Sequence, residues 1–137
     1  EELEIARVYE RMEQHRLGDR LKVDWQLGTL AKGAEIPGLT IQPLLENAIY
    51  HGIEPSPQPG TISVRGETDG KLIRISVTNP LPPAGMASRP GHGLALENIR
   101  ERLELAFGTN GALAVDAAPD RYTVTIIFPA DGVRTYS

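Results

Sequence analysis

The stretch that decides the fold of this chain is QPLLENAIYHG, residues 42–52, taken together with GHGLALENIR, residues 91–100. In the first stretch, helical spacing puts Asn47 and His51 on one face, and a stripe of leucine, alanine and isoleucine is left for the opposite, buried side. In the second, two glycines stand directly before an amphipathic helix, where free backbone N–H groups and the helix dipole favour phosphate. Together the two stretches predict the halves of a nucleotide pocket.

Composition predicts one soluble domain, and the lack of cysteine fits a reducing compartment without proving one. At 137 residues with 40% hydrophobic residues, the chain can bury a core of useful size. Its 14 Lys and Arg against 18 Asp and Glu give a net charge of -4, which argues against direct binding of nucleic acid. The absence of cysteine excludes a disulfide framework and a thiolate zinc site. Because the chain begins without Met inside an expected helix, we expect it to be cut from a larger protein.

Alternating apolar and polar residues predict five strands. They lie around residues 21–27, 62–64, 73–77, 113–115 and 122–128. Each strand has one apolar and one polar face, whereas parallel sheets covered on both sides read as continuous apolar runs. We therefore expect an α/β (α+β) two-layer sandwich, in which a mixed, mostly antiparallel five-stranded sheet carries its helices on one face.

Three amphipathic helices are predicted to form the second layer, over residues 2–17, 40–51 and 94–107. The apolar stripe of the first consists of Ile5, Val8, Tyr9 and Met12. Thr40 is expected to cap the second helix. The loop over residues 80–93 has four prolines and three glycines, and a loop of this length is usually a lid, a binding loop or a disordered segment.

Five segments follow one another in a recognisable order: Tyr9-Glu10, RLGDRL at 16–21, Ile36-Pro37, the stretch 42–52, and residues 91–103. In this order they resemble the C-terminal catalytic domain of the LytS/AlgZ family of sensor histidine kinases, with AlgZ-like members closest. The resemblance covers nearly the whole chain and implies the Bergerat (GHKL) fold in a single domain, residues 1–137. It also implies that helix 2–17 continues from a dimerisation region and that residues 80–93 form an ATP lid.

The resemblance implies ATP and Mg²⁺ as cofactors and gives roles to three residues of the first stretch. Asn47 matches the asparagine whose carbonyl oxygen ligates the Mg²⁺ that bridges the ATP phosphates, and Mg²⁺ prefers such hard oxygen ligands. Glu46 is a candidate for polarising the nucleophile or holding metal-bound water, and His51 for contacting the phosphates. The alternatives are an asparagine bonded to a neighbouring carbonyl, an exposed helix carboxylate, and a histidine that compensates the helix dipole.

The lid and the helix after it supply further candidate nucleotide ligands: Gly91, Gly93, Leu94 and Asn98. The two glycines match those of the family's lid, where the absence of Cβ lets backbone approach phosphate. Leu94 is expected to begin the helix, and Asn98 matches an asparagine of the family's Gly-Leu-x-Asn run. Arg89 and His92 are candidates for bringing positive charge to the triphosphate, with solvated loop residues as the alternative.

The main departure from the family pattern is Asn79, which stands where an aspartate usually accepts a hydrogen bond from the adenine amino group. An amide oxygen can accept the same bond, weaker by about 1 kcal/mol than with a charged acceptor. The amide NH₂ can equally face a keto group, so adenine selectivity stays open. Prolines and Leu81 also replace the usual glycines after this position, and Ala95 replaces the third lid glycine.

The function implied by the resemblance is the ATP-binding catalytic domain of a two-component sensor histidine kinase. It would donate the ATP γ-phosphate to a histidine on a separate dimerisation domain, for relay to a LytTR-type response regulator. The resemblance further implies a homodimer and a cytoplasmic location in a bacterial inner-membrane protein whose membrane segments lie upstream. The alternative, motivated by Asn79 and the proline-rich lid, is a degenerate regulatory or interaction module with weak or no ATP binding. A hydrolase on the same fold is disfavoured, because Pro43 stands where its general-base carboxylate would be.

Overall fold

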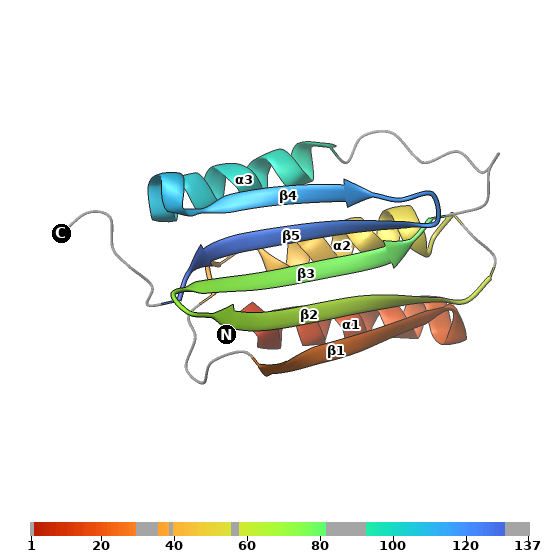
Figure 1. Ribbon diagram of the computed structural model, residues 1–137. Helices are drawn as coiled ribbons and strands as arrows, with labels where there is room; N and C mark the ends of the chain where they lie inside the picture. The colour runs from red at the N-terminus through yellow and green to blue at the C-terminus, as the bar shows by residue number, and fades with distance from the viewer. Residues whose placement is uncertain (1, 30–35, 39, 56–57, 82–92, 131–137) are drawn as a thin grey trace.

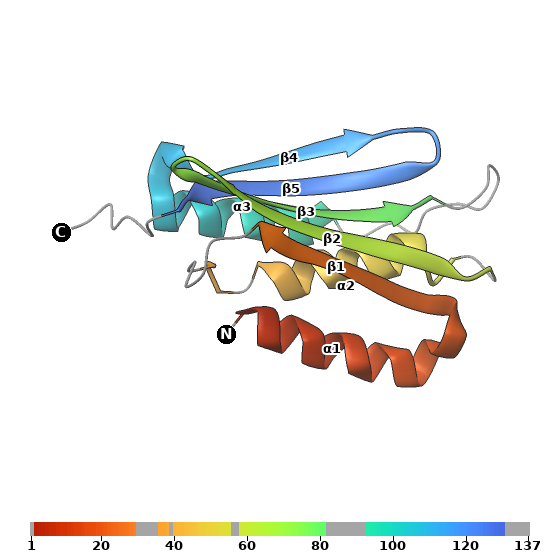
Figure 2. The same cartoon turned by 60° about the horizontal axis from the view of Figure 1, so that its bottom comes forward.

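The computed structural model describes residues 2–29, 36–38, 40–55, 58–81 and 93–130. Within these ranges, three α-helices cover one face of a single sheet, and no described element covers the other face (Figures 1 and 2). In chain order the elements are α1 (Glu2–Leu17), η1 (Gly18–Arg20), β1 (Leu21–Thr29), α2 (Ile41–Gly52), β2 (Gly60–Asp69), β3 (Leu72–Pro80), α3 (Gly93–Phe107), η2 (Gly108–Asn110), β4 (Ala112–Ala117) and β5 (Arg121–Pro129). The predicted two-layer sandwich is confirmed.

The sheet has the strand order β1-β2-β3-β5-β4. Strands β1 and β2 pair in parallel, and the other three pairs are antiparallel, as the alternating pattern predicts. The parallel pair requires a crossover connection, and α2 lies in that connection. As a result, α2 packs under the middle of the sheet, between α1 and α3 (Figure 2).

The core lies between α2 and the central strands. The apolar stripe of α2 is buried as predicted, and it packs with the inward-facing isoleucines and valines of β2, β3 and β5. Phe107 at the end of α3 stacks on Phe128 of β5, with ring centroids 5.5 Å apart. The edge strand β4 is more open than its alternation suggests, since Val115 is 43% exposed. None of the helices in the described ranges is long and apolar enough to cross a membrane.

The predicted helix α1 is confirmed, but of its apolar stripe Tyr9 alone packs partly against the core. Ile5, Val8 and Met12 are 49%, 47% and 63% exposed, while Ala6 of the same helix is fully buried. Polar contacts orient the helix: the Trp25 indole N–H donates to Glu10 at 2.9 Å, and Arg7 lies over the Trp25 ring at 4.5 Å from its centroid. These contacts to β1 turn the apolar stripe of α1 away from the sheet.

The predicted cap of α2 is wrong. The Thr40 hydroxyl makes no capping bond and instead donates to the carbonyl oxygen of Pro37 at 2.7 Å. The cap is Glu2, the first residue of α1, whose carboxylate accepts hydrogen bonds at 2.9 to 3.2 Å from the backbone N–H groups of residues 40, 41 and 42. A carboxylate is favoured at this place because it satisfies free N–H groups and faces the positive end of the helix dipole.

Candidate functional site

Helix α2 carries Asn47 and His51 as the sequence predicts. Asn47 is only 3% exposed, and its side-chain amide makes no hydrogen bond to any residue that the structure describes. An asparagine bonded to a neighbouring carbonyl, the alternative interpretation, is therefore not what is found. His51 lies one turn later and is half-buried, with its ring edge-to-face against Tyr50 at 5.1 Å.

The end of α2 packs closely against the end of β3, where Asn79 is located (Figure 1). A Cβ atom on Gly52 would lie 2.7 Å from the Cβ of Asn79 and 2.8 Å from the carbonyl oxygen of Pro80. Only glycine allows an approach of this kind without displacing backbone. Gly52 therefore brings the helix that carries Asn47 against the strand end that carries Asn79.

The amide of Asn79 has a defined orientation. Its Nδ2 donates a hydrogen bond of 2.7 Å to the carbonyl oxygen of Pro80, and the side chain is 1% exposed. The opposite orientation would place two acceptor oxygens at this distance, which is unfavourable. The NH₂ group is thus engaged by the protein, and Oδ1 is the atom that remains for a ligand.

Glu46 and Asn98 lie on opposite walls of one groove. This groove, of about 440 Å³, separates α2 from α3 and is lined by Pro43 and Glu46 on one side and by Asn98 on the other. Glu46 accepts a hydrogen bond from the Gln42 amide at 2.9 Å, and it is half-buried rather than the exposed carboxylate of the alternative interpretation. Burial, then the carboxylates of Glu13 and Glu46, raise the pKa of Tyr9, so the phenol stays neutral beside α2.

Of the residues predicted in the lid and at the start of the helix after it, the structure describes only some. Gly93 is the first residue of α3, so the helix begins one residue before Leu94, its predicted start. Gly91 and the two candidate cations of the lid, Arg89 and His92, lie outside the described residues.

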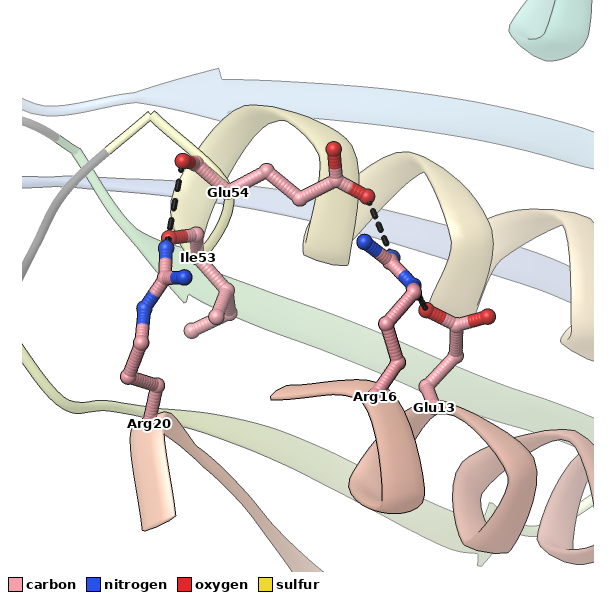
Figure 3. Close-up of polar contacts among 5 residues, drawn as sticks. All are labelled: Glu13, Arg16, Arg20, Ile53 and Glu54. Atoms are coloured by element: carbon pink, nitrogen blue, oxygen red, sulfur yellow. Dashed lines mark hydrogen bonds and ion pairs between the residues drawn. The ribbon is translucent and has the colours of Figure 1, made fainter. Parts of the chain in front are cut away.

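Sequence reasoning missed a set of contacts that hold the end of α2 (Figure 3). Arg20 Nη2 donates to the carbonyl oxygens of Ile53 at 3.0 Å and Glu54 at 3.2 Å. Arg16 donates to the Glu54 carboxylate at 2.7 Å and also bonds Glu13, and these two hydrogen bonds raise the pKa of Arg16. Both arginines belong to RLGDRL, a segment that carries the resemblance, but nothing in the sequence says what they touch.

The chain has relatives among the sensor histidine kinases. It is 33% identical over 130 residues to the sensor histidine kinase YesM of Bacillus subtilis, a match that covers 93% of this chain and 22% of that protein. It is 29% identical over 144 residues to the sensor protein LytS of Staphylococcus haemolyticus, with 97% of this chain and 25% of that protein covered. The chain belongs to the sensor histidine kinases. No protein-family model matches it.

Solved histidine kinase catalytic domains share the fold of this chain. The catalytic domain of histidine kinase ThkA superposes with a TM-score of 0.71 and 17% identity over 93% of this chain and 90% of that one. ThkA in complex with the response regulator TrrA gives a TM-score of 0.65 and 17% identity over 95% of this chain and 40% of that one. At these identities the likeness extends to the fold alone.

The chain spans only part of the length of these relatives. It covers 22% of the length of YesM and 25% of the length of LytS, so it corresponds to one part of those proteins. LytS itself is among the relatives, in agreement with the predicted family. The closer assignment to AlgZ-like members stays a prediction.

Proposed function

We propose that this chain is the ATP-binding catalytic domain of a two-component sensor histidine kinase. The observation that carries the proposal is the close packing of α2 on β3 at Gly52. Through it, Asn47, whose amide makes no hydrogen bond to a described residue, and Asn79, whose amide oxygen is left for a ligand, stand on two elements that touch. Asn47 suits the metal-phosphate end of a nucleotide, and Asn79 suits its base.

Asn47 fits a Mg²⁺ ion. The Asn47 side-chain amide makes no hydrogen bond to any described residue, so its oxygen is available to a ligand. The amide oxygen is a hard, neutral donor, and Mg²⁺ keeps most of its shell as water and phosphate oxygens. When bound, Mg²⁺-ATP supplies the γ-phosphoryl group and the metal neutralises the charge on the phosphates.

The residues of the chain would act by binding and orienting. Asn79 Oδ1 would accept a hydrogen bond from the exocyclic amino group of adenine, while the bond to Pro80 keeps its NH₂ away from the base. His51 would contact phosphate from the last turn of α2, and Glu46 and Asn98 would line the adjoining groove. Gly91, Gly93 and Leu94 would let the lid approach the phosphates. Such positioning accounts for most of the catalysis in phosphoryl transfer.

The partners of the intact protein are part of the proposal. The acceptor histidine would lie on a dimerisation domain elsewhere in the protein, because the resemblance implies an acceptor in a His-Phe-x-x-Asn motif and His15, His51 and His92 do not stand in one. The complex of ThkA with the response regulator TrrA supports a response regulator as partner. We propose that this regulator is of the LytTR type, that the intact kinase is a homodimer, and that this domain faces the cytoplasm beneath the inner membrane.

Calorimetric titration tests the proposal directly. The chain is titrated with ATP in the presence and absence of Mg²⁺, and then with ADP and GTP. We expect Mg²⁺-dependent binding that prefers adenine, is lost in Asn47→Ala and is kept in Asn110→Ala, a matched control at an exposed asparagine of η2. No heat with any nucleotide at millimolar concentration, together with an intact fold, would favour the degenerate interaction module instead.

A further inference from the structure

The turn that follows α2 is held by a residue to which the proposed function gives no role. We propose that Arg20 is a positioning residue for the nucleotide site, because it fixes the turn after α2 and thereby the contact of Gly52 with Asn79. The inference rests on the proposed function and deepens it. It makes the segment RLGDRL, which joins α1 to β1, part of the site's supporting structure.

The first step is the contact of Arg20 with backbone. Its guanidinium reaches across from η1 to two successive carbonyl oxygens, those of Ile53 at 3.0 Å and Glu54 at 3.2 Å (Figure 3). The N–H groups of the same two residues both donate to the carbonyl oxygen of Ile49 at 3.0 Å, which marks the end of the helix. Carbonyl groups at a helix C-terminus lack intrahelical donors, and a cation is favoured there.

The second step leads from this turn to the base-binding residue. Gly52 directly precedes Ile53, and its backbone lies against the side chain of Asn79 and the carbonyl oxygen of Pro80. That oxygen is also the one that accepts the hydrogen bond from Asn79 Nδ2. A displacement of the turn at residues 53 and 54 therefore changes the surroundings of the amide whose oxygen is left for adenine.

The neighbouring arginine provides a contrast. Arg16 bonds the side chain of Glu54 rather than its backbone, and the Arg16 side chain is 51% exposed. An exposed ion pair between flexible side chains restrains the backbone weakly. Arg16 is thus a control at the same turn, and Arg74, which pairs with Asp69 at the distant β2–β3 end, is a control outside it.

The first experiment compares nucleotide affinity. ATP dissociation constants are measured with Mg²⁺ for the parent chain and for Arg20→Ala, Arg20→Lys, Arg16→Ala and Arg74→Ala, at a temperature where circular dichroism shows every variant folded. We expect binding to weaken by about tenfold in Arg20→Ala, as small misplacements of binding groups do, and to be partly restored in Arg20→Lys. The two control variants should stay within about twofold of the parent.

The second experiment tests, without nucleotide, whether the surroundings of Asn79 and Gly52 change. In ¹H–¹⁵N spectra of the free chain, we expect the side-chain NH₂ signals of Asn79 and the backbone N–H signal of Gly52 to shift in both Arg20 variants and to stay in place in Arg74→Ala. If Arg20→Ala does not fold, both measurements are made on Arg20→Lys alone.

The outcomes separate this inference from the proposed function. If the parent binds ATP and the Arg20 variants bind equally well with unmoved Asn79 signals, the inference is overturned and the proposed function stands, even if the variants melt at lower temperature. If the parent binds no ATP, the proposed function is wrong, and the inference that rests on it is wrong as well.

Discussion

Helices α1 and α2 carry the same kind of apolar stripe, and the structure uses the two stripes in opposite ways. In α2 the stripe is buried against the sheet, whereas in α1 the residues Ile5, Val8 and Met12 face outward. The difference lies in the polar contacts that each helix makes with the rest of the fold. The orientation of α1 is set by Glu2 at the cap of α2, by the Trp25 contacts and by Arg16 at Glu54. Periodicity identifies an amphipathic helix, but polar partners decide which way it turns.

The largest expected effect on stability distinguishes the buried stripe of α2 from the exposed stripe of α1. Leu45→Ala in α2 removes a fully buried side chain, and we expect the free energy of unfolding to fall by about 2–5 kcal/mol. Met12→Ala in α1 removes a side chain that is 63% exposed, and we expect a change below about 0.5 kcal/mol. Urea unfolding of both variants checks the contrast, and equal losses would show that the stripe of α1 is buried in solution.

A smaller effect is expected where α2 touches β3. Gly52→Ala would place a Cβ atom 2.7 to 2.8 Å from Asn79 and from the backbone of Pro80, so we expect a loss of about 1–3 kcal/mol in unfolding free energy together with weaker ATP binding. The matched variant is Gly28→Ala, since a Cβ there meets no atom within 4 Å among the described residues. Equal stability of the two variants would contradict the close approach.

The cap of α2 comes next. Glu2→Ala removes the acceptor for three backbone N–H groups of α2, and we expect thermal unfolding to show a loss of about 1–2 kcal/mol. The matched variant Glu4→Ala alters an exposed carboxylate of the same helix and should change stability by less than about 0.5 kcal/mol. A Glu2 variant as stable as its control would mean that Thr40 or water caps the helix.

The smallest effect concerns Asn79. Asn79→Asp restores the residue usual in the family, but it replaces the N–H donor to Pro80 by an oxygen at the same place. We expect a loss of about 1 kcal/mol in unfolding free energy and a gain of about 1 kcal/mol or less in the preference for ATP over GTP, because Oδ1 would already serve as the acceptor and the carboxylate adds only its charge. A marked rise in this preference, measured by calorimetry, would show that the amide of Asn79 turns in solution.

Most of the fold was predictable from local pattern. In a strand with one buried face, apolar and polar residues alternate with period two. Five such segments predict a mixed sheet with one apolar face, and the helices are expected to cover that face. The placement of Asn47 and His51 on one helix was also predictable from their spacing, whereas their roles stay a prediction. The cap of α2 was not, because Thr40 is the usual capping residue and Glu2 lies 38 positions away along the chain.

The sequence by itself determined the elements, their amphipathic character, the family, and the candidate residues of the proposed nucleotide site. These depend on interactions between near neighbours in the chain, whose geometry is set by the helical and strand repeats. Only the tertiary structure decided the direction of the α1 stripe, the cap at Glu2, the orientation of the Asn79 amide and the contacts of Arg20. Each of these depends on which polar groups meet across the fold, because a buried donor or acceptor must find a partner wherever the packing brings one.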